Sequence, residues 1–279
     1  MTAITTVPGR VRSQPRTGLA SRVRAGVRTT GAMTLLAASA TTGAVTDIVG
    51  RRFSWEECLL QAWFMVRVSL LPTILVAIPF GVIVSVQVGG VAQQIGAASF
   101  SGAVNGIGVL RQGAPLVTSL MIAGAVGSAM CSDLGARTIR EEVDALRVMG
   151  IDPVRRLVAP RLVAAVGVAL LLNVVVAVTA IGTGYALNVG GGDVSSGTYL
   201  GSFVSFAAPS DLVLAELKAA VFGFIATVVA AHKGLGATGG PRGVAEAVNQ
   251  AVVLSFILLA LVNVALTQAY VLLVPQRIA

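Results

Sequence analysis

The densest group of charged side chains after the N-terminal region lies at residues 138–161, TIREEVDALRVMGIDPVRRLVAPR. Thr138 and Glu141 have the spacing of a capping box, and Gly150 followed by Pro153 is typical of a helix end. These signals predict a helix of about eleven residues, roughly 16 Å long at 1.5 Å per residue. A helix this short and this charged does not cross a bilayer, so its chemistry is that of charged and apolar contacts outside the membrane.

One side of this predicted helix is apolar, and a single carboxylate, that of Glu142, interrupts it. A stripe of this kind suits docking into a groove of another protein, although a solvated helix between two membrane spans gives a similar pattern. The apolar stripe consists of Ile139, Val143, Leu146 and Met149, and another side carries Arg140, Asp144 and Arg147. The residues predicted to form the docking helix are Ile139, Arg140, Glu141, Glu142, Val143, Asp144, Ala145, Leu146, Met149 and Gly150.

Polar side chains within the apolar segments are candidates for a membrane site, because ionisable groups at membrane depth are usually functional. They are Asn173, Glu216, Lys218 and Asn263. A hydrogen bond between helices explains Asn173 as well as a transport site does. Glu216 and Lys218 lie about one turn inside the outer end of a predicted span. There a local pair that snorkels to the interface is the alternative to a functional role.

The composition is that of an integral membrane protein. Of 279 residues, 55% are hydrophobic and 11% are charged, whereas soluble domains carry about 25% charged residues. His232 is the sole histidine and stands apart from any cysteine or carboxylate cluster, so we expect no metal site and no cofactor in this chain. Cys58 and Cys131 are expected to be unpaired thiols at the cytoplasmic face.

Apolar segments predict an all-α integral membrane fold with five transmembrane helices and a short cytoplasmic helix between spans 2 and 3. The predicted spans are 68–91, 112–131, 162–187, 211–231 and 244–274. The segment Arg51–Arg67, with Trp55 and Trp63, predicts an interfacial helix before the first span. Residues 96–108 fit an outer loop, a re-entrant turn or a close-packed helix end, and residues 188–210 are expected to form an outer loop.

The positions of the basic residues predict the topology. Of 20 lysines and arginines, 17 lie in the region up to Arg67, in the block 137–161, or at Lys233 and Arg242. This is the positive-inside pattern and not a nucleic-acid-binding patch. It places the N-terminus inside and the C-terminus outside the cytoplasmic membrane. We expect residues 1–50 to form a basic cytoplasmic tail with a weak interfacial segment, and residues 51–279 to form the membrane domain.

Three short motifs follow one another in the charged block: EExDAL, MGxxP and LxxPR. Together they resemble the core of the MlaE/YrbE family, the permease subunits of ABC-type lipid transporters that work with MCE-domain proteins. The likeness runs from about Trp55 to the C-terminus. It implies that the short cytoplasmic helix is the coupling helix that seats in the ATPase subunit. The motif residues are Glu141, Glu142, Asp144, Ala145, Leu146, Met149, Gly150, Pro153, Leu157, Pro160 and Arg161.

The resemblance also implies a set of partners. Family members form dimers with a lipid path between the two subunits, capped on the outer side by MCE domains. This chain looks most similar to the actinobacterial YrbE proteins, which implies a heterodimer with a paralogous permease. It also implies uptake of fatty acids, mycolic acids or sterols across the mycobacterial envelope. The sequence has no Walker motif, so we expect ATP and Mg²⁺ to bind a partner ATPase and this chain not to be an enzyme.

Other functions leave different signatures. An ion-coupled carrier would need carboxylates near the membrane midplane and repeated halves. An intramembrane enzyme would need a Ser/His dyad or paired aspartates within the spans. A non-transporting membrane scaffold for an MCE assembly is the alternative that the sequence excludes least well. The scarcity of charge within the spans favours an apolar cargo over an ion or a sugar.

Overall fold

The computed structural model describes residues 19–51, 53–192 and 194–273, and the regular structure in these ranges is helical. The α-helices are α1 (Leu19–Val49), α2 (Trp55–Gln94), α3 (Ser101–Gly108), α4 (Ala114–Met121), α5 (Gly127–Ile139), α6 (Glu142–Val148), α7 (Ala159–Gly190), α8 (Ser196–Phe206), α9 (Pro209–Leu235) and α10 (Gly240–Leu273). Residues 1–18 of the predicted basic tail and residues 274–279 at the C-terminus lie outside the described residues.

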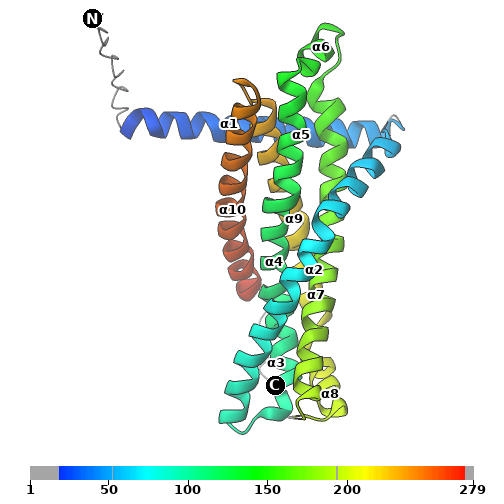
Figure 1. Cartoon of the computed structure of the whole chain (residues 1–279), viewed down its shortest axis with the longest axis vertical. Coiled ribbons are helices and arrows are strands. Elements are labelled where there is room, and N and C mark those ends of the chain that lie inside the picture. Colours follow the sequence, from blue (N-terminus) through cyan, green and yellow to red (C-terminus); the bar gives the residue numbers. More distant parts are fainter. Residues whose placement is uncertain (1–18, 52, 193, 274–279) are drawn as a thin grey trace, which may run out of the picture.

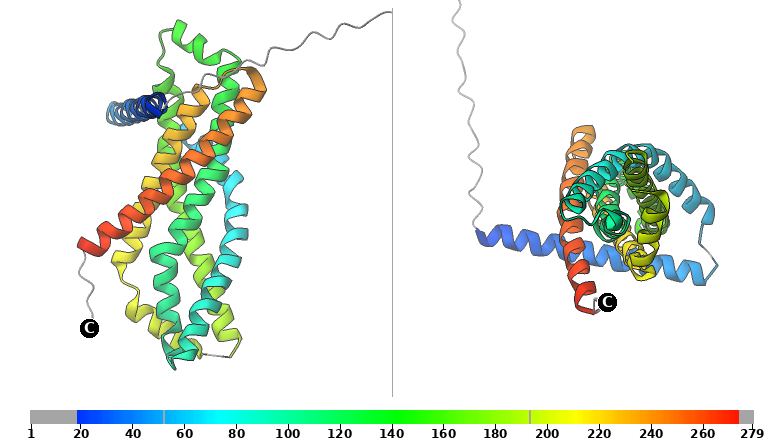
Figure 2. Two further views of the ribbon diagram at one scale, coloured as in Figure 1. Left: turned by 90° about the vertical axis from the view of Figure 1, so that its left-hand side faces the viewer. Right: turned by 90° about the horizontal axis from the view of Figure 1, so that it is seen from below.

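The long helices form a bundle with α6 projecting at one end and α3 and α8 at the other (Figure 1). We call these the α6 end and the α8 end. Among the described residues, six helices are long and apolar enough to cross a membrane. Five of them run along the bundle, whereas the sixth, Arg28–Val49 within α1, lies across it near the α6 end (Figures 1 and 2). The all-α membrane fold class is therefore confirmed, and the five lengthwise helices correspond to the five predicted spans.

The second span is one long helix, Ala98–Ile139, that contains two π-helical turns, η2 (Val109–Gly113) and η3 (Ile122–Val126). Of the three alternatives for residues 96–108, the close-packed helix end describes most of this segment. α3 packs against α8 so closely that a Cβ atom at Gly106 would lie 2.3 Å from the Phe203 ring. An added side chain at this position would therefore require the Phe203 ring to move.

Two predicted segments are wrong. Arg51–Arg67 is not a separate interfacial helix, because α2 begins at Trp55 and runs unbroken into the first span. No break signal separates the charged start of α2 from its apolar continuation, and the helix that lies crosswise is α1. The predicted outer loop 188–210 contains α8, whose N-cap Ser195 accepts a hydrogen bond from the Thr198 backbone N–H (3.2 Å). A Gly- and Ser-rich composition concealed that capping signal.

Helix α7 packs closely against both α2 and α9. Small residues allow both approaches. A Cβ atom at Gly81 of α2 would lie 2.7 Å from the Ala180 carbonyl oxygen, and one at Gly223 of α9 would lie 2.8 Å from that of Ala165. In a membrane, close backbone packing of this kind replaces much of the hydrophobic driving force between helices. The close packing of these three helices therefore fixes the positions of the polar groups on their facing sides.

Candidate functional site

Helix α6 is shorter than the sequence predicts, and it begins differently. It spans 7 residues, Glu142–Val148. The predicted capping box does not form, because Thr138 still belongs to α5 and its hydroxyl donates to the Leu134 carbonyl (2.9 Å). Glu141 instead occupies the N-cap with a left-handed backbone (φ 61°) and without a side-chain cap. The membrane helix thus runs on to Ile139, past the predicted end of the span at Cys131, before the chain turns into α6.

The predicted end of the helix is correct. Gly150 has a φ of 75°, a conformation that glycine adopts at little cost. Its N–H donates to the Arg147 carbonyl (3.0 Å), and the Ile151 N–H donates to the Leu146 carbonyl (2.9 Å). This pair of bonds is a Schellman motif. It reverses the chain after α6 and directs it towards α7.

The apolar stripe of α6 is only partly available to a partner. Val143 is 2% exposed and packs within the chain, and Leu146 is half-buried. Val148 is 89% exposed, Met149 is 64% exposed, and Ile151 is also exposed. We call Val148, Met149 and Ile151 the α6 tip. The exposed apolar surface thus lies towards the C-terminal end of the predicted helix, because Val143 is buried within the chain.

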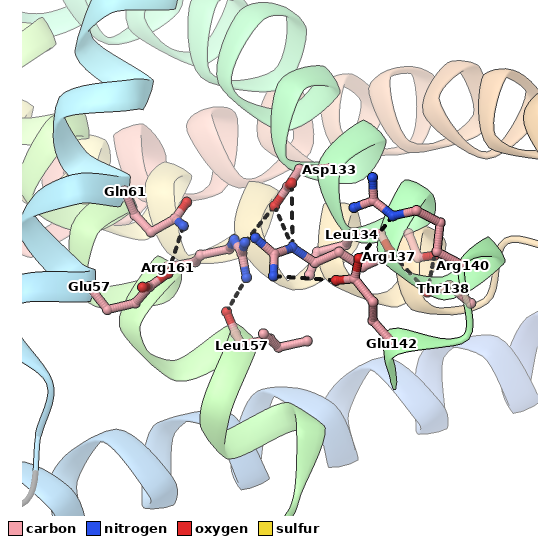
Figure 3. A network of polar contacts seen from close by, with 11 residues as sticks. Glu57, Gln61, Asp133, Leu134, Arg137, Thr138, Arg140, Glu142, Leu157 and Arg161 are labelled. Atoms are coloured by element: carbon pink, nitrogen blue, oxygen red, sulfur yellow. Dashed lines mark hydrogen bonds and ion pairs between the residues drawn. The ribbon is translucent and has the colours of Figure 1, made fainter. Parts of the chain in front are cut away.

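Glu142, which interrupts the predicted stripe, already has partners in its own chain (Figure 3). Its carboxylate lies 2.9 Å from Arg140 Nε and 3.7 Å from Arg137 Nη1, with 43% of the side chain exposed. These contacts within its own chain fix the turn between α5 and α6.

The same polar network continues towards α7 through Asp133 and Arg161 (Figure 3). Asp133 accepts hydrogen bonds from Arg137 and from Arg161, and the Arg161 guanidinium also donates to the Leu157 carbonyl (2.7 Å). Arg161 is 2% exposed. We call Asp133, Arg137, Arg140, Glu142 and Arg161 the α6-end network. It ties both segments that flank α6 to each other.

Helix α1 is attached to the same end of the bundle. Arg155, in the π-helical turn η4 (Val154–Val158) that leads into α7, forms a two-pronged ion pair with Asp47 of α1. The aliphatic part of Arg155 also lies against Gly43. The segment after α6 is therefore held from two sides, by α1 and by α5.

The four predicted membrane polar residues separate into two groups. In the first group, the Asn173 side-chain amide donates to Glu216 (2.9 Å), and the Asn173 carbonyl oxygen accepts from the Thr118 hydroxyl (3.3 Å). These contacts join α4, α7 and α9. Asn173 therefore forms hydrogen bonds between helices, which is one of the two alternatives that the sequence left open. One of these bonds connects it directly to Glu216.

Lys218 belongs to the second group, and the predicted pairing with Glu216 is wrong. Residues two apart on a helix face different directions. Lys218 is also completely buried, so it does not snorkel. Its ammonium donates to the Arg111 backbone carbonyl and to the Thr267 hydroxyl, each at 2.8 Å. The π-helical turn η2 contains that carbonyl, and Lys218 supplies it with a donor.

Sequence reasoning missed the strongest contact of this group. The Arg111 guanidinium donates to both carboxylate oxygens of Asp211, at 2.7 and 3.3 Å, and Tyr270 donates to the same carboxylate at 3.0 Å. Asp211 is fully buried. We call Arg111, Asp211, Lys218, Thr267 and Tyr270 the buried cluster. The available signal was that Asp211 and Lys218 are seven residues apart, which places them on one face of α9.

Asn263 of α10 adjoins this cluster. Its side-chain amide donates to Gln112 (3.3 Å), and its backbone carbonyl accepts from Thr267 (2.7 Å). The buried cluster and its neighbours thus hold η2, α9 and α10 together. Among the described residues, no three His, Cys, Asp or Glu side chains lie together in a way that could hold a metal ion.

A cavity of about 440 Å³ lies beside the first polar group, between α7, α8 and α9. Asn173 and Glu216 line it, and so do two tyrosines and a majority of apolar side chains. The full lining is Leu110, Asn173, Val174, Ala177, Val178, Ile181, Gly182, Tyr185, Tyr199, Leu200, Phe203, Leu212, Ala215 and Glu216. This volume is typical of sites that bind one small molecule, about 300–1,000 Å³.

The fold is thus a helical membrane bundle with a charged projection at one end and a mostly apolar cavity between its helices. The sequence matches the family described as Permease MlaE over residues 58–269, and the chain belongs to that family. The resemblance to the MlaE/YrbE family is therefore confirmed at the level of the family. Its narrower form, a likeness to actinobacterial YrbE proteins, stays a prediction.

Three relatives illustrate the similarity. A probable ABC transporter permease protein of Rickettsia bellii is 32% identical over 164 residues, which cover 59% of this chain and 63% of that protein. One of Synechocystis sp. is 33% identical over 193 residues, 66% of this chain and 70% of the relative. The intermembrane phospholipid transport system permease protein MlaE of Haemophilus influenzae is 28% identical over 186 residues, covering 66% and 71%. The match thus spans less than two thirds of the Rickettsia protein.

Proposed function

We propose that this chain is the membrane-spanning permease subunit of an ABC-type lipid transporter whose ATP hydrolysis takes place in a separate ATPase. The observation that carries the proposal is the α6 projection in a chain of the MlaE family. Its tip exposes Val148 and Met149 beyond the bundle, and the α6-end network anchors its base to both flanking spans. An apolar tip on an anchored base suits a contact that transmits a mechanical displacement.

In this proposal the chain itself performs no chemistry. Closure of the partner ATPase displaces α6, and the pairs Glu142–Arg140 and Asp133–Arg161 pass that displacement to α5 and to the start of α7. Because α7 packs closely against both α2 and α9, the displacement spreads to the bundle as a rigid-body movement. Val143 keeps α6 seated on the bundle during this movement, since it is buried within the chain.

The cargo and the partners belong to the same proposal. The name of the Haemophilus influenzae relative specifies phospholipid transport, which supports a lipid cargo. From the family resemblance, we propose a paralogous YrbE-type permease as the second subunit and MCE-domain proteins at the α8 end. Fatty acids, mycolic acids and sterols are the proposed lipids. The proposed location is the cytoplasmic membrane, with the N-terminus inside and the C-terminus outside.

Co-purification with the cognate ATPase tests the central claim. The purified chain alone should not hydrolyse ATP, and the complex should do so in a lipid-stimulated, orthovanadate-sensitive manner. Met149→Asp should abolish co-purification, because it places a charge at the α6 tip, whereas Glu246→Gln, on the exposed start of α10, should not. Hydrolysis by the isolated chain would overturn the permease assignment. A stable complex without lipid transport would instead favour the scaffold alternative.

Cysteine labelling tests the orientation. With Cys58 and Cys131 replaced, single cysteines at Arg147 and Ser196 should react with a membrane-impermeant maleimide from opposite sides of the membrane. Arg147 lies on α6 and Ser196 begins α8, at the two ends of the bundle (Figure 1). Labelling of position 147 from the outside of intact cells would contradict the proposed topology.

A further inference from the structure

The cavity between α7, α8 and α9 has one polar end within an otherwise apolar lining. The polar end consists of Asn173 and Glu216. Further along are Val178, Ile181 and Leu200. Tyr185 follows Asn173 by twelve residues, which places it about 18 Å further along α7 at 1.5 Å per residue. The site is therefore elongated and amphipathic, with its polar group deep in the bundle and tyrosines near the α8 end.

The cavity opens at the outer surface of the bundle. Val178 is 67% exposed, and Leu200 and Leu212 on the neighbouring helices are about half exposed. Because α7 and α9 are long and apolar enough to span a membrane, their exposed side chains here face its apolar interior and not water. A ligand that enters here comes from the bilayer. It has to be largely apolar, because it leaves lipid for a cavity lined mostly by aliphatic and aromatic groups.

The chemistry at the deep end selects the polar group of that ligand. The Asn173 amide donates to Oε1 of Glu216 (2.9 Å). Among the described residues, this amide is the only hydrogen-bond partner of the Glu216 carboxyl group, which leaves Oε2 free to accept a further donor. A hydroxyl group supplies one O–H donor and is far cheaper to bring into an apolar site than an ammonium ion, whose desolvation cost is much larger.

We propose that this cavity is a binding site for a neutral, alcohol-headed lipid, whose hydroxyl donates to Glu216 and whose hydrocarbon body extends past Val178 and Ile181 towards Tyr185. The assignment does not depend on the proposed transport function, because it concerns binding by this chain alone. Tyr199 helps to shape the far end. Its hydroxyl accepts a hydrogen bond from Asn105 (2.8 Å), and its ring lies edge-on to that of Tyr185, with the ring centroids 5.5 Å apart.

Photo-crosslinking of the purified full-length chain tests the proposal. The probe is hexadecanol with a diazirine in its chain, and the matched probes are its methyl ether, which lacks the O–H donor, and hexadecylamine. We expect the alcohol to label α7, α8 and α9, as mapped by mass spectrometry. Unlabelled hexadecanol should compete for that labelling at a concentration about tenfold lower than the methyl ether needs, a difference of 1.4 kcal/mol.

Two variants separate recognition of the head from occupation of the cavity. Glu216→Leu should remove the preference for the alcohol over the methyl ether, while the alcohol probe and the ether probe both still label the site. Gly182→Leu should abolish labelling by both probes, because Gly182 lines the cavity and a Cβ atom there meets nothing within 4 Å, so the added side chain fills open space without disturbing the fold. Glu246→Leu removes a carboxylate at the other end of the bundle and should change nothing.

Three results would overturn the proposal. Equal competition by the alcohol and the ether would show that the hydroxyl is not recognised. Stronger labelling by the amine than by the alcohol would make the site one for cations. Labelling that maps away from α7, α8 and α9 would place binding elsewhere. Gel filtration and thermal unfolding of each variant show whether it has folded. Should Glu216→Leu fail to fold, Glu216→Gln, which keeps an acceptor oxygen, should retain more of the preference than Asn173→Leu.

Discussion

The two polar networks of this chain contain similar groups in opposite surroundings. The α6-end network and the buried cluster each contain arginines paired with carboxylates. At the α6 end, the Arg140 and Glu142 side chains are 62% and 43% exposed, so water competes for their contacts. In the buried cluster, Asp211 and Lys218 are fully buried. The Arg140–Glu142 pair can therefore exchange its contacts for water, whereas the Arg111–Asp211 pair has to stay intact.

This difference indicates what each network does. Half-exposed pairs are individually weak and can exchange partners at little cost, which suits a segment that docks and moves. A buried charge without its partner is expensive, so the buried cluster keeps η2, α9 and α10 in one arrangement. Arg161 is the exception at the α6 end, because it is buried although its partner Asp133 is partly exposed.

The largest effect is expected from Asp211→Ala. It strands the Arg111 guanidinium and removes one of the two acceptors of Tyr270, the other being the Ser210 hydroxyl. Breaking a buried pair in this way typically costs about 3–5 kcal/mol. Since the Arg111 side chain is 29% exposed, we expect a value near the lower end. Denaturant titration of the purified protein in detergent measures the loss. Asp211→Asn should lose less, because it keeps an acceptor, and a loss below about 1 kcal/mol for Asp211→Ala would contradict the role of the cluster.

A smaller loss is expected from Asp133→Ala. It leaves Arg161 buried with the Leu157 carbonyl as its remaining hydrogen-bond acceptor among the described residues. We expect a destabilisation of about 1–3 kcal/mol, the usual cost of an unmet buried polar group. The matched change is Arg137→Ala, which removes a partly exposed partner of the same carboxylate. Equal stability of the two variants in the same denaturant titration would show that burial of Arg161 is not what makes Asp133 necessary.

Glu142→Lys should change stability little but association strongly. It places a third cation beside Arg137 and Arg140, both partly exposed, so the stability change should be roughly 0–1 kcal/mol. The turn that orients α6 is lost, however, and we expect the affinity for the partner ATPase to fall about tenfold, or 1.4 kcal/mol. Binding of each purified variant to surface-immobilised ATPase measures this affinity. Glu142→Gln serves as the control with a milder effect, and unchanged affinity for Glu142→Lys would refute the coupling role of α6.

The smallest effect is expected from Arg147→Ala. Arg147 pairs only with Asp144, at 2.7 Å, among the described residues, and both side chains are more than 60% exposed. Pairs of this kind are worth about 0.5 kcal/mol or less. Neither the denaturant midpoint nor ATPase affinity should change measurably. A loss as large as that of Glu142→Lys would show that the whole surface of α6, and not its tip and base, makes the contact.

Local signals predicted part of the candidate site and failed at a definable point. Gly150 was correctly read as the end of α6, because a glycine in the left-handed conformation is a property of a few adjacent residues. Thr138 was misread as the start of α6, since a hydroxyl can cap a new helix or donate back to the i−4 carbonyl of an existing one. Which of these two roles Thr138 takes depended on the packing of α5 against α9. There its hydroxyl also lies within hydrogen-bond distance of the Gly234 carbonyl, at 3.3 Å.

The sequence by itself determined the membrane class, the five lengthwise helices and the family, because hydropathy and linear motifs are written in consecutive residues. Only the tertiary structure decided which partner each polar group finds. Arg111 and Asp211 are 100 residues apart, and Asn173 and Glu216 are 43 apart. Within lipid, a polar group takes whichever partner the packed helices bring to it, since water is absent and leaving the group unpaired costs several kcal/mol. Helix packing, and not local spacing, therefore assigned Lys218 to the Arg111 carbonyl and left Glu216 facing the cavity.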